Sequence, residues 1–449
     1  MTGVSLSRWT MSYFAAALIA LLAAEVMMAM GFGYPAVAIT SPDTLILVHV
    51  VAIGWLSLLM CGALLQFLPV LVAQPLHSNV LAVPALAALI AGLVALVLAF
   101  LQLDGRIDFG APFFAVAAAL LSLGFVLVIW NLVRTMIASH IVPLPAWFVA
   151  AGLASAAATV ALGVIFSLVL GGTIESGPLL TLLGAGLPIH AIAGLGGWLT
   201  FTAVGVSYRL LAMFMLAPEL EGASVKGALA FGSGALAIVI VGGVVAVLLE
   251  GNLSLTLLAA LAVALPACGF YGADAVHLYR ARKRRIVELN SRMSGVALGY
   301  LAASVALVTV LTVMGRLSDH VGVVAFLVAF GWLTGLGLSQ LYKIVAFVTW
   351  LECYGPVLGK TQTPRVQDLV VEARAAKWFA LYFIAVGLGA VALLADAPTV
   401  FRLAAVAMLA GTFGIAVQLL RTRRLADVNA QMRLPQGVRI PRLLLTCHT

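Results

Sequence analysis

Two histidines and one glutamate lie inside long apolar runs of the sequence, where ionisable side chains are rare. His49 is six residues before Trp55. His190 is eight residues before Trp198, and Glu25 is followed by three methionines within five positions. Ionisable groups in such runs are functional candidates by default. The imidazoles suit a metal or heme iron, whereas the carboxyl group suits proton handling or pairing with a buried cation.

Each candidate also has a purely structural interpretation. The neighbours of His190 at helical spacing include Gly186, Gly194 and Gly197, so its face is nearly bare of side chains. Such a face could admit a flat macrocycle or let another helix pack closely. The three methionines after Glu25 could hold copper(I), or they could simply fill apolar space.

A polar or basic residue follows each of three tryptophans at the same spacing of eleven positions. These residues are Gln66, Arg209 and Lys343. Long polar side chains at the inner end of a membrane helix can extend to the lipid headgroups. A polar access path from the cytoplasm, with Glu25 further along it, is the functional alternative.

Composition identifies the environment of all these residues. The chain has 449 residues, of which 64% are hydrophobic and 9% charged, and its mean hydropathy is +1.18. These values exclude a soluble globular domain. The apolar runs reach the roughly 20 residues that a membrane helix needs, and backbone groups cannot stay unpaired in hydrocarbon. We therefore expect an all-α polytopic membrane protein, in contact with the lipid bilayer.

The apolar runs predict twelve transmembrane helices. They lie near residues 10–33, 44–73, 79–102, 112–136, 145–171, 186–216, 225–249, 253–279, 293–315, 321–350, 375–396 and 399–421.

Charged connectors predict the orientation of these helices. Basic residues gather on one side, in the runs 280–292, 360–377 and 421–442, and acidic residues dominate the other side. Both termini are then cytoplasmic, in what we expect to be a bacterial inner membrane. The net charge of +8 fits anionic lipid better than nucleic acid. The first helix is too long for a cleaved signal and should stay in place.

A short motif recurs three times and predicts an internal repeat. Residues 54–57, 197–200 and 331–334 all read Gly-Trp-Leu followed by Ser or Thr. The tryptophans are 143 and 134 residues apart, and each interval holds four predicted helices. We predict one membrane domain over residues 1–449, built from three pseudo-symmetric four-helix repeats and a cytoplasmic tail. The repeats cover about 10–140, 145–285 and 290–425, and the tail covers 426–449.

This arrangement resembles subunit I of the heme-copper oxidase superfamily. The second helix, from His49 through Trp55 and Gly62-Ala63 to a Leu-Pro end, is similar to that of the nitric oxide reductase branch. The resemblance implies that His49 is an axial ligand of a low-spin heme. It also places His190 on the sixth helix, where the family holds a ligand of the active-site metal.

Several ligands of that family are missing from this sequence. The tenth helix has no His-x-His pair near Trp332, and the seventh, residues 225–249, has no histidine. Gly194 replaces the tyrosine expected four residues after the histidine of the sixth helix. A heme–metal reaction centre needs an axial ligand and a ligand cluster for the second metal. We therefore do not expect oxygen or nitric oxide reduction, and leave open whether the protein is an enzyme.

Two hypotheses remain at this stage. In the first, His49 and His190 are the axial ligands of one heme b near the periplasmic face. Its role is electron transfer or the handling of heme or nitric oxide, beside other respiratory or cytochrome subunits. In the second, the protein is a cofactor-free transporter or an assembly or interaction subunit, whose paths are lined by Glu25 and the glycine-rich sixth helix.

Overall fold

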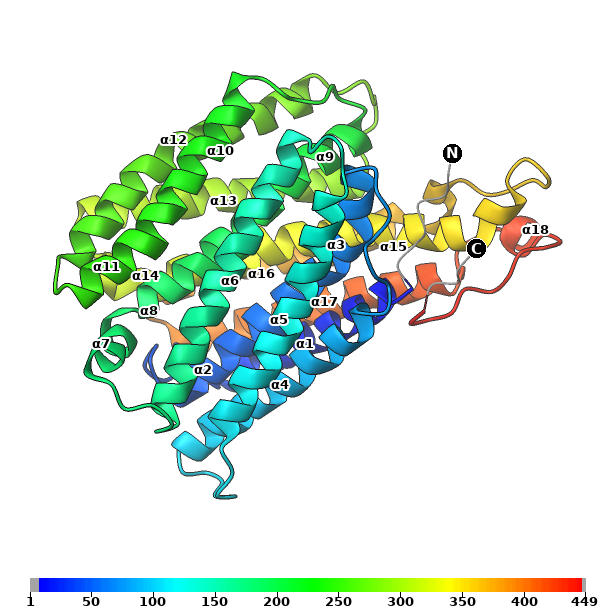
Figure 1. Cartoon of the computed structure of the whole chain (residues 1–449). Helices are drawn as coiled ribbons and strands as arrows, with labels where there is room; N and C mark the ends of the chain where they lie inside the picture. Colours follow the sequence, from blue (N-terminus) through cyan, green and yellow to red (C-terminus); the bar gives the residue numbers. More distant parts are fainter. Residues whose placement is uncertain (1–7, 446–449) are drawn as a thin grey trace. The chain divides into compact units, whose positions relative to one another are not determined.

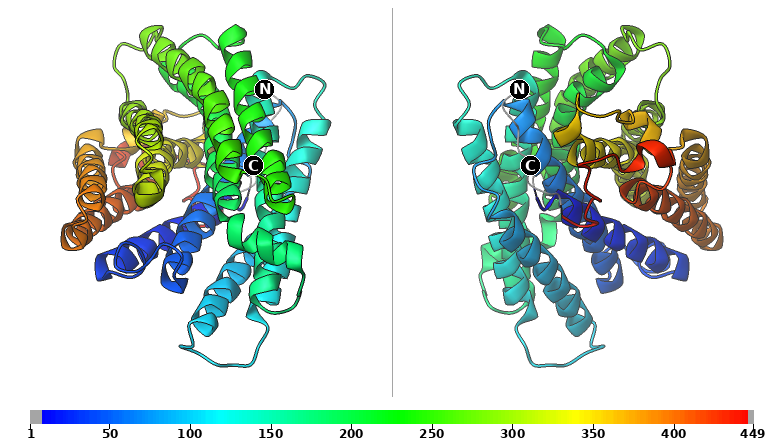
Figure 2. Two further views of the ribbon diagram at one scale, coloured as in Figure 1. Left: turned by 90° about the vertical axis from the view of Figure 1, so that its left-hand side faces the viewer. Right: turned by 90° about the vertical axis from the view of Figure 1, so that its right-hand side faces the viewer.

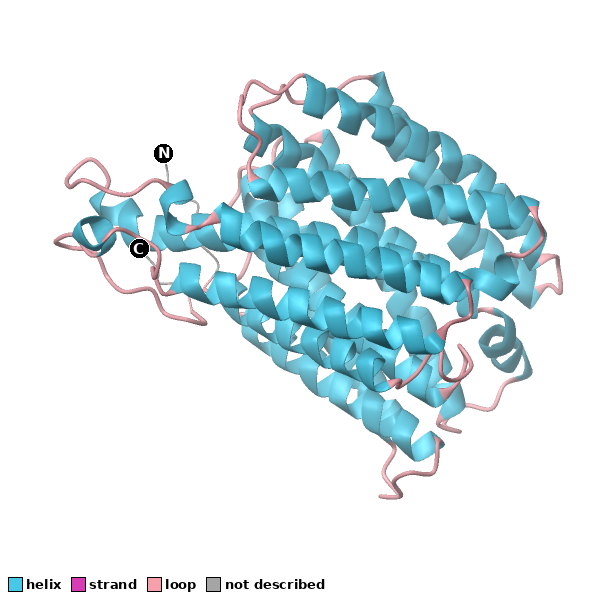
Figure 3. Cartoon of the chain, turned by 180° about the vertical axis from the view of Figure 1, so that it is seen from behind, coloured by secondary structure: helices cyan, strands magenta, loops and turns pink. Residues whose placement is uncertain are grey.

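The computed structural model describes residues 8–445, and the chain is helical throughout this part (Figures 1 and 3). Helices make up 78% of the chain, and no strand occurs among the described residues. Twelve helices of this described part are long and apolar enough to cross a membrane. The prediction of an all-α polytopic membrane protein is confirmed.

The observed spans follow the predicted ones closely. The largest difference is seven residues, at the end of the tenth span, which reaches Val357 instead of residue 350. The spans are Thr10–Met30, Pro42–Leu71, Ala82–Leu103, Phe113–Ile137, Leu144–Leu170, Leu187–Met215, Ala223–Leu248, Leu253–Arg280, Leu289–Val313, Leu317–Val357, Glu372–Leu394 and Pro398–Arg423.

The chain divides into two compact units. Unit 1 consists of residues 1–66 and 287–449, and unit 2 consists of residues 67–286 between them. Each unit contains helices from more than one predicted repeat. The division into three four-helix repeats therefore stays a prediction from the sequence motif.

Unit 1 is built from the first two and the last four spans. Its helices are α1 (Thr10–Met30), α2 (Pro42–His49), η1 (Val50–Ser57), α3 (Leu58–Leu71, which crosses into unit 2), α13 (Leu289–Val313), α14 (Leu317–Phe326), η4 (Leu327–Thr334), α15 (Gly335–Tyr354), α16 (Glu372–Leu394), α17 (Pro398–Arg423) and the short α18 (Ala430–Arg433). Two 3₁₀ turns, Gly355–Val357 and Val366–Leu369, connect α15 to α16.

Small residues let the helices of unit 1 approach one another. A Cβ atom added at Gly411 of α17 would lie 2.9 Å from the backbone nitrogen of Tyr382 on α16. Only glycine allows this approach without displacing the backbone, as in other membrane helix pairs. On its other side α17 packs against α1. The three helices α1, α16 and α17 therefore share a closely packed interior.

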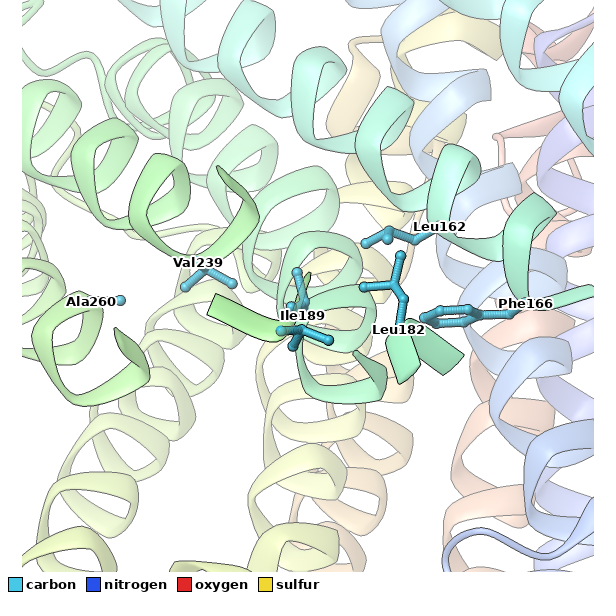
Figure 4. Close-up of a cluster of buried hydrophobic side chains, with 7 residues drawn as sticks. Leu162, Phe166, Leu182, Ile189, Val239 and Ala260 are labelled. Carbon is cyan, nitrogen blue, oxygen red and sulfur yellow. The ribbon is translucent and has the colours of Figure 1, made fainter. Parts of the chain in front are cut away.

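Unit 2 consists of α4 (Ala82–Leu103), α5 (Phe113–Ile137), α6 (Leu144–Leu170), α7 (Gly177–Ala185), α8 (Leu187–Ala191), η2 (Ile192–Phe201), α9 (Thr202–Met215), α10 (Ala223–Ala237), η3 (Ile238–Gly242), α11 (Gly243–Leu248) and α12 (Leu253–Arg280). Helices α10 and α12 lie side by side (Figure 2). A core cluster including Phe166, Leu182 and Ile189 joins α6, α7 and α8 (Figure 4). This cluster fixes the start of the helix that carries His190.

The segment after α17 packs against other parts of unit 1, to which it also belongs. Tyr354 at the end of α15 donates a hydrogen bond from its hydroxyl to the Arg433 carbonyl oxygen (2.8 Å). The Ser12 hydroxyl on α1 donates to the Leu444 carbonyl oxygen (2.7 Å). Residues 426–445, the described part of the predicted tail, therefore contact both the first helix and the tenth span. The last four residues of that tail lie outside the described part.

Candidate functional site

The three copies of the Gly-Trp-Leu-Ser/Thr motif all lie in π-helical segments. These segments are η1, η2 and η4. A π-helix bonds each N–H to the carbonyl five residues earlier, is rare, and often marks functional sites. A fourth segment of this kind, η3 in unit 2, has no copy of the motif. The repeated sequence is thus matched by a repeated local backbone, which helical periodicity could not have predicted.

His49 is the last residue of α2 and directly precedes η1. Its side chain is half-buried, and Nδ1 lies 2.7 Å from the carbonyl oxygen of Leu45. A carbonyl oxygen can only accept, so Nδ1 carries the proton and Nε2 carries the lone pair. Metal-ligating histidines commonly have this arrangement, because the backbone carbonyl fixes both tautomer and ring orientation.

His190 lies on α8, two residues before η2, and its ring faces α6. A Cβ atom added at Gly163 would be 3.3 Å from the His190 Cε1 atom, so this glycine provides room for the ring. The Phe166 ring lies on the same side, with centroids 5.6 Å apart. From the sequence, the glycines expected beside His190 were those of its own helix. The glycine that contacts the ring is on α6, 27 positions earlier.

The third copy has phenylalanine where the first has histidine. Phe326 directly precedes η4, as His49 precedes η1. Its ring packs against Phe330 and Phe401, with centroids 5.1 and 5.5 Å away. The position is therefore filled by an aromatic cluster, and it offers no ligand atom.

The structure does not support the copper interpretation of the methionines. Met28 is 2% exposed, whereas Met30 is 73% exposed, so their sulfur atoms point to different sides of α1. Residues 8–445 also contain no group of three His, Cys, Asp or Glu side chains placed to hold a metal ion.

Glu25 is fully buried between α1 and α17. The Thr412 hydroxyl donates a hydrogen bond to Glu25 Oε1 (2.7 Å). The second carboxyl oxygen, Oε2, has no hydrogen-bond partner within the described residues. Thr412 is 387 positions away in the sequence, and nothing in the apolar pattern of α17 singles it out.

Other polar groups of unit 1 gather around η4. The Trp55 Nε1–H donates to the Thr334 hydroxyl (2.8 Å), which itself donates to the Ala329 carbonyl oxygen (2.7 Å). The Tyr382 hydroxyl donates to the next carbonyl oxygen, that of Phe330 (2.8 Å). The first and third copies of the motif are thus joined by a hydrogen bond between a tryptophan and a threonine of the motif itself.

Carboxylate partners are found for Lys343 and Arg209, which both follow a motif tryptophan by eleven positions. Lys343 Nζ lies 2.6 Å from Glu288 Oε2, and both side chains are largely buried. Arg209 forms an ion pair with Glu219 in the connector after α9. Gln66 is half-buried at the end of unit 1. These ion pairs give Lys343 and Arg209 a structural role, while the polar path stays a prediction.

The end of unit 1 where α13 and α16 begin and α17 ends, here called the basic end, contains ion pairs that the sequence analysis missed. Arg423 Nη1 lies 2.6 Å from Glu352 Oε2, and both side chains are 3% exposed. Arg423 also donates to the carbonyl oxygens of Arg442 and Leu445. The alternating charge of these segments gave no indication of which arginine would be buried.

No family model matches the sequence, and a search of curated proteins found no relative.

Proposed function

We propose that this integral membrane protein binds heme b, with His49 as an axial ligand, and serves in electron transfer or in the handling of heme or nitric oxide. The hydrogen bond between His49 Nδ1 and the Leu45 carbonyl oxygen carries the proposal. The second axial ligand, predicted from the sequence alone, is His190. Partners among respiratory or cytochrome subunits belong to the same proposal.

The surroundings of His49 meet one requirement of a heme ligand. The Leu45 carbonyl oxygen fixes the tautomer of His49 with its Nε2 lone pair, which is the form that binds iron. Each histidine lies within two residues of a π-helical segment. When bound, heme supplies reversible one-electron chemistry at its iron, with a potential set by ligands and burial. The chain's own contribution would be to hold and orient the imidazoles in an apolar environment.

The absorption spectrum of the purified protein tests the proposal. We expect protein expressed with ample heme to be pigmented and to give a b-type pyridine hemochrome. His49→Ala should lose most of the heme or change the absorption spectrum of the heme that remains. His190→Ala should do the same if His190 is the second ligand. His77→Ala is the matched control, because His77 is exposed in a connector; its spectrum should stay that of the wild type.

Two results would contradict this proposal in different ways. Colourless, heme-free wild-type protein would exclude heme binding and favour the cofactor-free transporter or the assembly subunit. A wild-type spectrum in both histidine variants would retain heme but reject the proposed ligands.

A further inference from the structure

The geometry points to a proton-binding site in the interior of unit 1, formed by the Glu25 carboxyl group and held in place by Thr412. This inference is independent of heme binding, because none of its residues is a proposed heme ligand. It concerns a single proton, taken up on and released from Glu25 Oε2.

The position of Glu25 makes its charged form costly. The side chain is 0% exposed, five residues before the end of α1, which corresponds to about 7 Å of helix. A charged side chain inside a membrane span is costly unless it is paired. No lysine, arginine or histidine pairs with Glu25 among residues 8–445. The neutral acid is therefore the form that this environment favours.

The protonated form is not fully satisfied either. Thr412 donates to Oε1, which makes Oε1 the carbonyl oxygen and leaves Oε2 to carry the proton. The resulting Oε2–H has no acceptor within the described part of the chain. A buried donor without an acceptor makes this state less favourable as well. The neutral form is favoured over the charged one, but no acceptor within the described residues holds its proton in place, as a site that exchanges its proton requires.

Polar side chains from two neighbouring helices, α16 and α17, lie around Glu25. Thr412 lies on α17, where the adjacent Gly411 packs against the backbone of Tyr382 on α16. The Tyr382 hydroxyl is held by the Phe330 carbonyl oxygen of η4. Arg402 lies nearer the end of α1, where its Nε–H donates to the Ala29 carbonyl oxygen (3.2 Å).

Infrared spectroscopy of the purified protein in lipid tests the site directly. We expect a carbonyl stretching band from a neutral carboxylic acid at neutral pH, lost in Glu25→Gln. The band should shift to lower frequency after transfer to D₂O, because the Oε2 proton exchanges with solvent. Glu288→Gln should leave it in place, since Glu288 is paired with Lys343.

A second variant keeps the test informative if Glu25→Gln does not fold. Thr412→Val removes the hydrogen bond to Oε1 and should move the same band to higher frequency without removing it. Absence of a neutral-acid band in folded wild-type protein would overturn the inference. A band that persists unshifted in D₂O would also overturn it, because a proton that never exchanges makes Glu25 a structural acid. Both results can be obtained whether or not the protein binds heme, so this test is separate from that of the proposed function.

Discussion

Glu25 and Glu352 are both buried in unit 1, but their partners differ. Arg423 Nη1 lies 2.6 Å from Glu352, whereas Glu25 has only the Thr412 hydroxyl as a partner among residues 8–445. Glu288 resembles Glu352, because Lys343 lies 2.6 Å from it. At the basic end, then, buried carboxylates connect helices through ion pairs. The Glu25 carboxyl group makes no such connection, and the two regions should respond differently to mutation.

Removing the cation from Glu352 should have the largest effect on stability. Arg423→Met removes the guanidinium group from the buried Glu352 carboxylate, and breaking a buried ion pair in this way costs about 3–5 kcal/mol. Thermal unfolding of the detergent-solubilised variant measures the loss. The double variant Arg423→Met, Glu352→Leu should recover much of it, because the buried carboxylate is removed together with its cation. A double variant no more stable than the single one would contradict this account.

Removing the cation from Glu288 should cost less. In Lys343→Met, Glu288 still accepts a hydrogen bond from Gln367 Nε2 (2.8 Å). The remaining donor limits the expected loss to about 2 kcal/mol. The same thermal assay, with Lys226→Met as an exposed control, would detect it. A loss equal to that of Arg423→Met would mean that the Gln367 bond contributes nothing.

The smallest effect should come from Asp427, just beyond the end of α17. Hydrogen bonds from Arg421 and then Arg374 hold the pKa of this carboxyl group below its ordinary value of 3.8. Its stabilisation is therefore complete above the unfolded pKa and is lost as the pH falls through the lower folded pKa. Because both arginines are partly exposed to solvent, we expect these ion pairs to contribute less than about 1 kcal/mol to the free energy of unfolding.

Comparison of the wild type with Asp427→Asn tests whether the Asp427 carboxylate stabilises the fold at neutral pH. The variant should be slightly less stable than the wild type at neutral pH, and the difference should disappear in acid. A difference that grows as the pH falls would show that the Asp427 carboxylate destabilises the fold.

The sequence predicted the helices of this protein well, but it predicted the contacts of their buried polar side chains poorly. The apolar runs predicted all twelve spans, because length and composition alone decide whether a helix can cross a bilayer. The motif predicts three equivalent helices, and this stays a prediction. It gave no sign of their π-helical backbone, since the pattern of side chains does not specify the hydrogen-bond register of a helix. The sequence identified Glu25, but its partner Thr412 stands among other small residues of α17. Which of them meets Glu25 depends on packing across Gly411 and Tyr382.

The order of the helices along the chain has a consequence for how the protein is made. Unit 2 is continuous, so all its helices are synthesised in succession, whereas unit 1 begins with residues 1–66 and resumes only at residue 287. Glu25 enters the membrane 387 residues before Thr412. At ordinary rates of synthesis this interval is about 20–80 s. During that time α1 carries its carboxyl group without its partner, so the nascent chain must tolerate this group until the last helix arrives.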